Sequence, residues 1–207
     1  MSGPLVLPVG HYGGAVHRSA GADVDHHVVR VGTTLHRLRP GGQLDTWALA
    51  HGTGDPDVPW DLDALLSAAA AAGIPAGAEL DELVALGLVG LVTDDDAPAF
   101  AAAHRLRPLL TGVGAPPGDP FEVIGIPGLP PSIRVRPRTA QVWRWTGLWP
   151  DLASASAARD RVARDSGREP DGLGELLADV QVLIGGSAAF LDVPGGGRPF
   201  RRHDLPV

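Results

Sequence analysis

The chain has 207 residues, 44% of them hydrophobic and 20% charged, which is ordinary for a globular protein of one large or two small domains. Cysteine is absent, which excludes disulfides, thiolate metal ligands and thiol nucleophiles. No apolar run is long enough to span a bilayer, and the N-terminal residues lack the basic and apolar regions of a signal peptide, so we expect a cytoplasmic protein without a membrane partner.

Charge is distributed unevenly along the chain, whose net charge is −7. Residues 1–100 contain 13 acids and 4 arginines, whereas residues 101–207 contain 11 acids and 13 arginines. The acidic first half argues against a general nucleic-acid-binding protein, which usually has a basic face. This distribution suits either a contact between the two halves or a basic partner that docks on the first half.

The first predicted elements are a loop-like segment and a β-hairpin. Residues 1–25 are rich in glycine and proline and predict an N-terminal extension with at most one short edge strand. Residues 26–38 predict the hairpin, because valines and leucines lie on both sides of a Gly-Thr turn. A short helix over residues 43–51 follows, with Trp47 at an apolar position.

Two leucine-rich helices and a strand complete the first predicted domain, residues 26–110. Residues 60–73 begin with acids, which interact favourably with a helix dipole, and carry apolar residues at helical spacing. Residues 78–86 predict a third helix, residues 88–92 a buried strand, and residues 97–110 a connector helix packed on this domain.

The second half follows the same order. Residues 111–132 contain six prolines and five glycines and are either a linker or a loop packed on the surface. Residues 133–193 predict a strand, three helices and a closing strand, and residues 194–207 a flexible tail.

The spacing of tryptophan and glycine favours an internal duplication. Trp47 lies 40 residues before Gly87, and Trp143 lies 42 residues before Gly185. We interpret the two tryptophans as core markers of two related domains.

A family resemblance rests on residues 38–92, which combine a strand pair, a helix ending in glycine, an amphipathic helix and a leucine-rich helix closing on Gly-Leu-Val. The residues that carry it are Trp47, Gly52, Leu65, Leu83, Gly87 and Leu88. The pattern resembles the PqqD-type peptide-binding winged helices, the recognition elements of enzymes that modify ribosomal peptides. Small transcriptional winged helices fit nearly as well. The resemblance implies an α+β fold of two winged-helix-like units, each a helical bundle with a small β-hairpin.

Peptide or protein binding by a non-enzymatic adaptor is the first functional hypothesis. The resemblance implies that the chain presents a precursor peptide to a modifying enzyme. An extended peptide can add to the exposed edge of a hairpin through main-chain hydrogen bonds, while its side chains fill a groove beside the third helix. The residues predicted to contact it, some of which must also be core, are Val28, Arg30, Leu35, Leu80, Leu83 and Val84.

A DNA-binding regulator is the alternative hypothesis. The basic surface of the second unit would be formed by Arg134, Arg136, Arg138, Arg159, Arg161 and Arg164. The third helix of each unit, which would enter the major groove, carries acids and no arginine, including Glu79 and Glu82 in the first unit and Asp179 in the second. Because carboxylates repel phosphates, DNA is the less favoured partner.

A metal-dependent enzyme is the third and weakest hypothesis. Its ligands would be His11, His17, His26 and His27, with Asp23 or Asp25, but no helix carries histidines at a metal-binding spacing. The glycine-rich segments match no P-loop or dinucleotide fingerprint, and no serine lies in a nucleophile elbow. We therefore expect no catalytic residue, metal ligand or cofactor, and the sequence does not indicate an oligomeric state.

Overall fold

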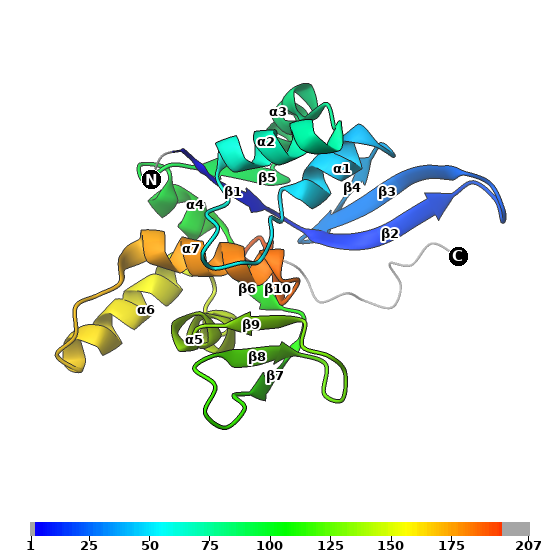
Figure 1. Ribbon diagram of the computed structural model, residues 1–207. Coiled ribbons are helices and arrows are strands. Elements are labelled where there is room, and N and C mark those ends of the chain that lie inside the picture. Colours follow the sequence, from blue (N-terminus) through cyan, green and yellow to red (C-terminus); the bar gives the residue numbers. More distant parts are fainter. Residues whose placement is uncertain (1–2, 196–207) are drawn as a thin grey trace.

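The computed structural model describes residues 3–195, which form seven helices and ten strands (Figure 1). The helices are α1 (Gly42–Leu49), α2 (Leu62–Ala72), α3 (Ala76–Ala85), α4 (Ala97–Ala103), α5 (Pro137–Thr146), α6 (Leu152–Asp165) and α7 (Gly172–Gly185). The strands are β1 (Leu5–Pro8), β2 (His11–His17), β3 (Val24–Val31), β4 (Thr34–Leu38), β5 (Val89–Val92), β6 (Arg105–Pro108), β7 (Thr111–Gly114), β8 (Glu122–Gly125), β9 (Ile133–Val135) and β10 (Ala189–Asp192). None of the helices within residues 3–195 combines the length and apolar character needed to cross a membrane.

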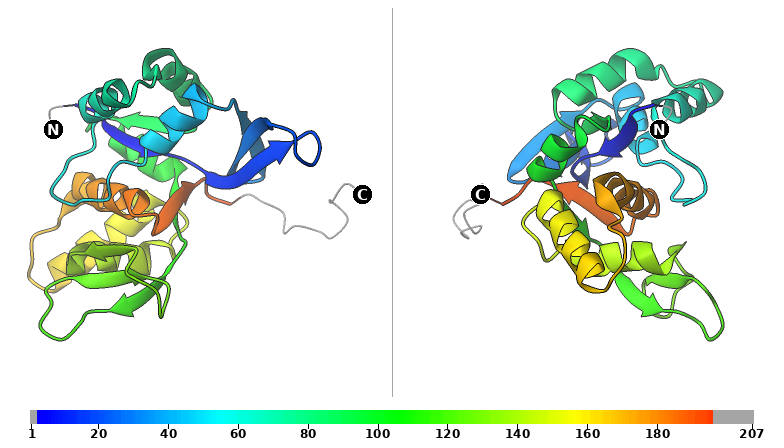
Figure 2. Two further views of the ribbon diagram at one scale, coloured as in Figure 1. Left: turned by 45° about the vertical axis from the view of Figure 1, so that its right-hand side comes forward. Right: turned by 90° about the vertical axis from the view of Figure 1, so that its left-hand side faces the viewer.

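The same order of elements occurs twice. In the first half, β1 precedes the antiparallel sheet β2-β3-β4, helices α1 to α3, and β5, which pairs with β1. In the second half, β6 precedes the sheet β7-β8-β9, helices α5 to α7, and β10, which pairs with β6. The two halves are stacked with α7 between them, and the β2–β3 hairpin extends away from the helices (Figures 1 and 2).

The prediction of two winged-helix-like units, each a helical bundle with a small hairpin, is wrong. The protein is a mixed α/β structure with four small antiparallel sheets. The additional strands lie in segments predicted to be loop or helix: β2 in the N-terminal extension, β7 and β8 in the proline-rich segment, and β6 in the connector helix, which ends at Ala103. These short strands are held by cross-strand pairing, which local sequence preference does not reveal.

Aspartate side chains begin two corresponding helices. Asp61 accepts a hydrogen bond from the Ala64 backbone N–H at 3.0 Å at the start of α2, and Asp151 accepts one from the Ser154 N–H at 2.7 Å at the start of α6. Each cap satisfies an N–H group that has no partner inside the helix. The acidic start predicted for the second helix is confirmed, and so is its end at Gly73.

Strand β1 belongs to two hydrophobic cores at once. Its residues Leu5 and Leu7, and Val9 after it, pack into a core built mainly by the second half, while Val6 packs into the core of the first half. This division follows from the alternation of side chains along a strand. The backbone after β1 also reaches the second half, because the Gly10 N–H donates to the carbonyl oxygen of Leu191 at 2.8 Å.

The halves also meet backbone to backbone at Gly54. A Cβ atom at this position would lie 2.6 Å from the backbone nitrogen of Gly186, a distance that real Cβ atoms do not show. The backbone φ of Gly54 is +69°, in the left-handed region. Nearby, the Gln181 amide donates to the His51 carbonyl oxygen at 3.2 Å, so the approach is accompanied by a side-chain hydrogen bond.

Substitution Gly54→Ala tests this contact. We expect a loss of roughly 2–5 kcal/mol in the free energy of unfolding, because a left-handed alanine is strained and its methyl group overpacks the interface. Gly167→Ala is the matched control, since Gly167 has a φ of +68° but open space around its Cβ position. It should cost only about 1–2 kcal/mol. Urea denaturation of both variants measures the difference, and equal losses would show that the glycine contact contributes nothing.

Two partly enclosed histidines end helices in the first half. The Nδ1–H of His51 donates to the Trp47 carbonyl oxygen at 3.0 Å, and that of His104 donates to the Phe100 carbonyl oxygen at 2.8 Å. Burial lowers the pKa of both imidazoles, and these hydrogen bonds offset the effect only in part. Both side chains are therefore neutral in the folded protein at pH 7.

Stability should consequently fall as the pH drops below 6.5, the ordinary histidine pKa. In that range the unfolded state binds protons before the folded state does, and the loss ends once the pH is below the lowered folded pKa. The double variant His51→Asn/His104→Asn should show a flatter pH dependence between pH 5 and 7 than the original protein, in urea denaturation at each pH. An unchanged slope in the double variant would contradict the prediction.

Candidate functional site

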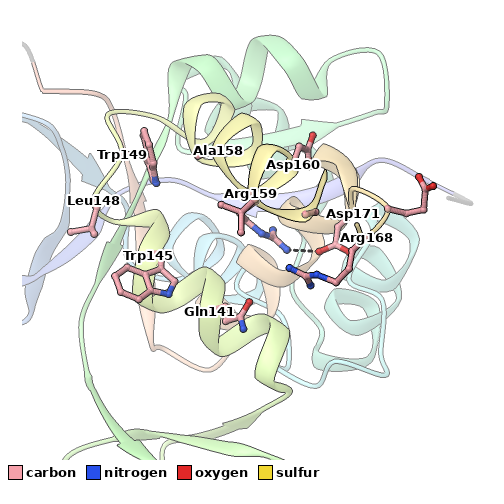
Figure 3. Close-up of a pocket in the computed structure, with 12 residues that line it drawn as sticks. Gln141, Trp145, Leu148, Trp149, Ala158, Arg159, Asp160, Arg168 and Asp171 are labelled. Carbon is pink, nitrogen blue, oxygen red and sulfur yellow. Dashed lines mark hydrogen bonds and ion pairs between the residues drawn. The ribbon is translucent and has the colours of Figure 1, made fainter. Parts of the chain in front are cut away.

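An open apolar groove of about 700 Å³ lies between α5 and α6 (Figure 3). Its walls come from the second half of α5, the loop after it, the outer face of α6 and the loop before α7. The apolar lining is formed by Trp145, Leu148, Trp149, Ala158 and Val162. The charged rim is formed by Arg159, Asp160, Arg168, Glu169 and Asp171.

Helical geometry divides the tryptophans of this region between core and groove. Trp143 and Trp145 are two residues apart on α5, so their side chains point to opposite sides of the helix. Trp143 packs against the core, and its indole N–H donates to the Ala188 carbonyl oxygen at 3.3 Å. Trp145 is 55% exposed, and Leu148 in the following loop is 75% exposed. A gathering of large exposed apolar side chains is typical of a binding surface.

The rim of the groove carries both signs of charge. The Arg159 guanidinium donates to the Asp171 carboxylate at 2.8 Å, which links α6 to the start of α7 (Figure 3). Asp160, Arg168 and Glu169 have no ion-pair partner among residues 3–195. The groove therefore offers an apolar floor with free charged groups at its edge.

The predicted peptide-contacting residues of the first sheet occupy different positions in it. Val28 and Arg30 lie on β3, the central strand, which pairs with β2 on one side and β4 on the other. Leu35 lies on the edge strand β4 and is 64% exposed. Only Leu35 is thus placed at the edge of the sheet.

The three predicted residues on α3 are likewise divided. Leu80 and Leu83 are enclosed in the core of the first half, where they pack with Trp47. Val84 lies on the outer side of the helix and is partly exposed. The structure therefore does not bring the six predicted residues together as one surface.

Most arginines of the predicted basic surface are ion-paired within the chain. The partners are Asp119 for Arg134 at 2.6 Å, Asp57 for Arg136 at 2.6 Å, Asp179 for Arg138 at 3.0 Å and Asp171 for Arg159 at 2.8 Å. Arg161 and Arg164 are exposed and have no ion-pair partner within residues 3–195. Acids of the chain therefore neutralise four of the six positive charges of the predicted surface.

Asp179, which the sequence placed among the acids of the last helix, is buried between α5 and α7. The Thr139 hydroxyl donates to its Oδ1 at 2.7 Å, and the Nε of Arg138 lies 3.0 Å from its Oδ2. Burial raises the pKa of this carboxyl, while Thr139 and Arg138 act in the opposite direction. Asp179 thus belongs to helix packing and not to a surface that could repel phosphates.

The histidines of β2 and β3 each have a separate partner. His27 shares a hydrogen bond of 2.8 Å with the Tyr12 hydroxyl, His26 contacts Asp25 at 3.0 Å, and His17 donates to a backbone carbonyl. The His11 ring packs on the ring of Phe190. Within residues 3–195, no group of three or more His, Asp or Glu side chains is placed to hold a metal ion.

Comparisons with protein-family models, with curated proteins and with solved structures return no match. The resemblance of residues 38–92 to PqqD-type domains therefore stays a prediction.

Truncating an exposed groove tryptophan and truncating a buried core tryptophan should change the free energy of unfolding by different amounts. Trp145→Ala should change the free energy of unfolding by less than about 1 kcal/mol, because the side chain is largely exposed. Trp47→Ala should cost about 3–5 kcal/mol, because Trp47 is buried. Chemical denaturation followed by circular dichroism compares the two. A large loss for Trp145→Ala would mean that this tryptophan serves the core and not the groove.

Proposed function

We propose that this chain is a peptide-binding adaptor that holds an apolar segment of a partner polypeptide in the groove between α5 and α6. The observation that carries the proposal is the exposure of Trp145, Leu148, Trp149 and Val162 around one groove. Leaving such side chains in water is unfavourable, by roughly 25 cal/mol for each Å² of apolar surface. A partner that covers them recovers this free energy.

The shape and composition of the groove favour a peptide over a compact ligand. Its four large apolar residues are between 41% and 75% exposed, so the groove is open and is not an enclosed cavity. Tryptophan and arginine, the residues that most often dominate binding energy at protein interfaces, both line it. The free charges of Asp160 and Arg168 at the rim can select polar side chains of the peptide.

A precursor peptide awaiting modification is the partner that the sequence resemblance supports. In that role the chain would hold the peptide while an enzyme acts on a distant part of it. The edge strand β4, with Leu35 exposed, offers a second place where an extended segment can add. DNA is a weaker candidate, because Arg134, Arg136 and Arg138 are already paired with acids of the chain.

A displayed library of random peptides, selected against the full chain, tests the proposal. The enriched peptides should carry two or more large apolar residues and should quench or shift tryptophan fluorescence when they bind. The double variant Trp145→Ala/Val162→Ser should weaken binding at least about tenfold, since it removes two anchoring contacts. Fluorescence anisotropy with labelled peptides provides the affinities.

Leu129→Ser is the control variant, because Leu129 is 61% exposed but lies in the loop between β8 and β9 and does not line the groove. It should leave the affinity of groove-binding peptides unchanged. Equal binding by the original protein and by Trp145→Ala/Val162→Ser would contradict the proposal, as would a failure to enrich any peptide. Salt-sensitive binding of duplex DNA in a mobility assay, without peptide binding, would favour the regulator instead.

A further inference from the structure

Three arginines converge on one buried carboxylate where β3, β6 and β10 meet. The Asp192 side chain is 3% exposed, and its Oδ2 lies 3.8 Å from Nη1 of Arg30, 3.8 Å from Nη2 of Arg105 and 3.9 Å from Nε of Arg107. Its Oδ1 is held by the backbone N–H groups of Gly32 at 2.6 Å and Val193 at 3.0 Å. The carboxylate is therefore fixed by the backbone, and the guanidinium groups surround its other oxygen.

These arginines differ from the other paired arginines of the chain. Elsewhere, as at Arg134 and Arg159, a guanidinium approaches its acid to within hydrogen-bond distance, at 2.6 and 2.8 Å. Around Asp192 all three distances exceed 3.5 Å, and none of the three side chains donates a hydrogen bond to the carboxylate. Among residues 3–195, the one hydrogen bond that these guanidinium groups make is from Arg30 to the Gly32 carbonyl oxygen, at 2.9 Å. Most of their roughly fifteen N–H donors are unused within the described chain.

The charges of this cluster do not cancel. Three guanidinium groups and one carboxylate give a local charge of about +2 at neutral pH. No other carboxylate of residues 3–195 lies within ion-pair distance of the three arginines. Mutual repulsion of the arginines is therefore relieved only in part by Asp192, and an added anion would complete the neutralisation.

The strand pairing holds the arginines in place and leaves Arg30 and Arg107 open to solvent, while the Arg105 side chain is more enclosed, at 21% exposed. Arg105 and Arg107 lie on the same face of β6, opposite Asp192 and Phe190 of β10, whereas Leu106 between them points into the core. The side chains of Arg30 and Arg107 are 40% and 44% exposed. Arg30 also lies over the ring of Phe190, 5.8 Å from its centre, which orients its guanidinium.

We propose that Arg30, Arg105 and Arg107 form a binding site for a phosphate group. A phosphate dianion matches the local charge of +2, and its oxygens accept the paired N–H groups that guanidinium presents. The phosphate is either a free ion or part of a phosphorylated peptide, and the chemistry of recognition is the same in both cases. The site shares no residue with the groove between α5 and α6 and does not depend on the function proposed for it.

Isothermal titration of the full chain with inorganic phosphate, at constant ionic strength with chloride as the reference, tests the site. The original protein should show saturable binding of one phosphate. Arg107→Gln should weaken it about tenfold, and Arg105→Gln/Arg107→Gln should abolish it, because each change removes a charge-assisted hydrogen bond. Arg134→Gln is the control, since Arg134 is an exposed, ion-paired arginine elsewhere in the chain, and it should bind as the original does.

A second set of titrations identifies the source of the phosphate. A short phosphoserine peptide that binds more tightly than inorganic phosphate would assign the site to phosphorylated chains, and equal affinity would assign it to the ion itself. The same peptide with glutamate in place of phosphoserine is the reference. If it binds more tightly than the phosphoserine peptide, the assignment to phosphate is overturned. Absence of saturable binding to the original protein would overturn the site, as would unchanged binding by Arg105→Gln/Arg107→Gln. If circular dichroism shows that the double variant does not fold, Arg30→Gln and Arg107→Gln singly must each lower the affinity.

Discussion

The alternation of side chains along β1 is the constraint on which the arrangement of the two halves depends. Leu5, Leu7 and Val9 on one side close the large core that contains α7 and β10, while Val6 on the other side closes the core around Trp47. The same strand is hydrogen-bonded to β5 along its length. Shifting its register by one residue would exchange the two sets of side chains between the cores, so β1 specifies the position of both halves together.

Unlike this shared core, the surface of the protein carries side chains whose interactions are incomplete. Apolar side chains of α5 and α6 such as Val142 and Leu152 are buried, and several arginines of the second half are paired with acids. Two groups of partly exposed side chains stand out from these: the tryptophan groove, and the three arginines around Asp192, which include Arg30 of the first half. Each is a local group of interactions left incomplete, one apolar and one ionic. That is why each is the basis of a separate proposal about a binding partner.

Local sequence was sufficient for the elements whose stabilising interactions are themselves local. The helical spacing of apolar residues predicted α2, in which Leu65 and Ala69 are buried, and the valines around a Gly-Thr turn predicted the β3–β4 hairpin. A short edge strand was expected near the start of the chain, and β1 does lie in a two-stranded sheet, but nothing near it in sequence shows that its partner is β5, with Leu5 opposite Val92. The groove was missed for a related reason. The two-residue offset of Trp143 and Trp145 indicates that they face opposite sides of α5, but only long-range contacts, such as the hydrogen bond from Trp143 to Ala188, decide which of them is covered.

The shared core of β1, α7 and β10 has a consequence for the order in which parts of the protein can fold during synthesis. The ribosome completes β1 long before it completes α7 and β10, which supply most of the cover for Leu5, Leu7 and Val9. Domains of many proteins fold one after another during synthesis, each burying its own apolar surface. Here the first half emerges with one face of its first strand still uncovered. Its apolar strip must remain in water, or be shielded by a chaperone, until residues near the end of the described chain arrive.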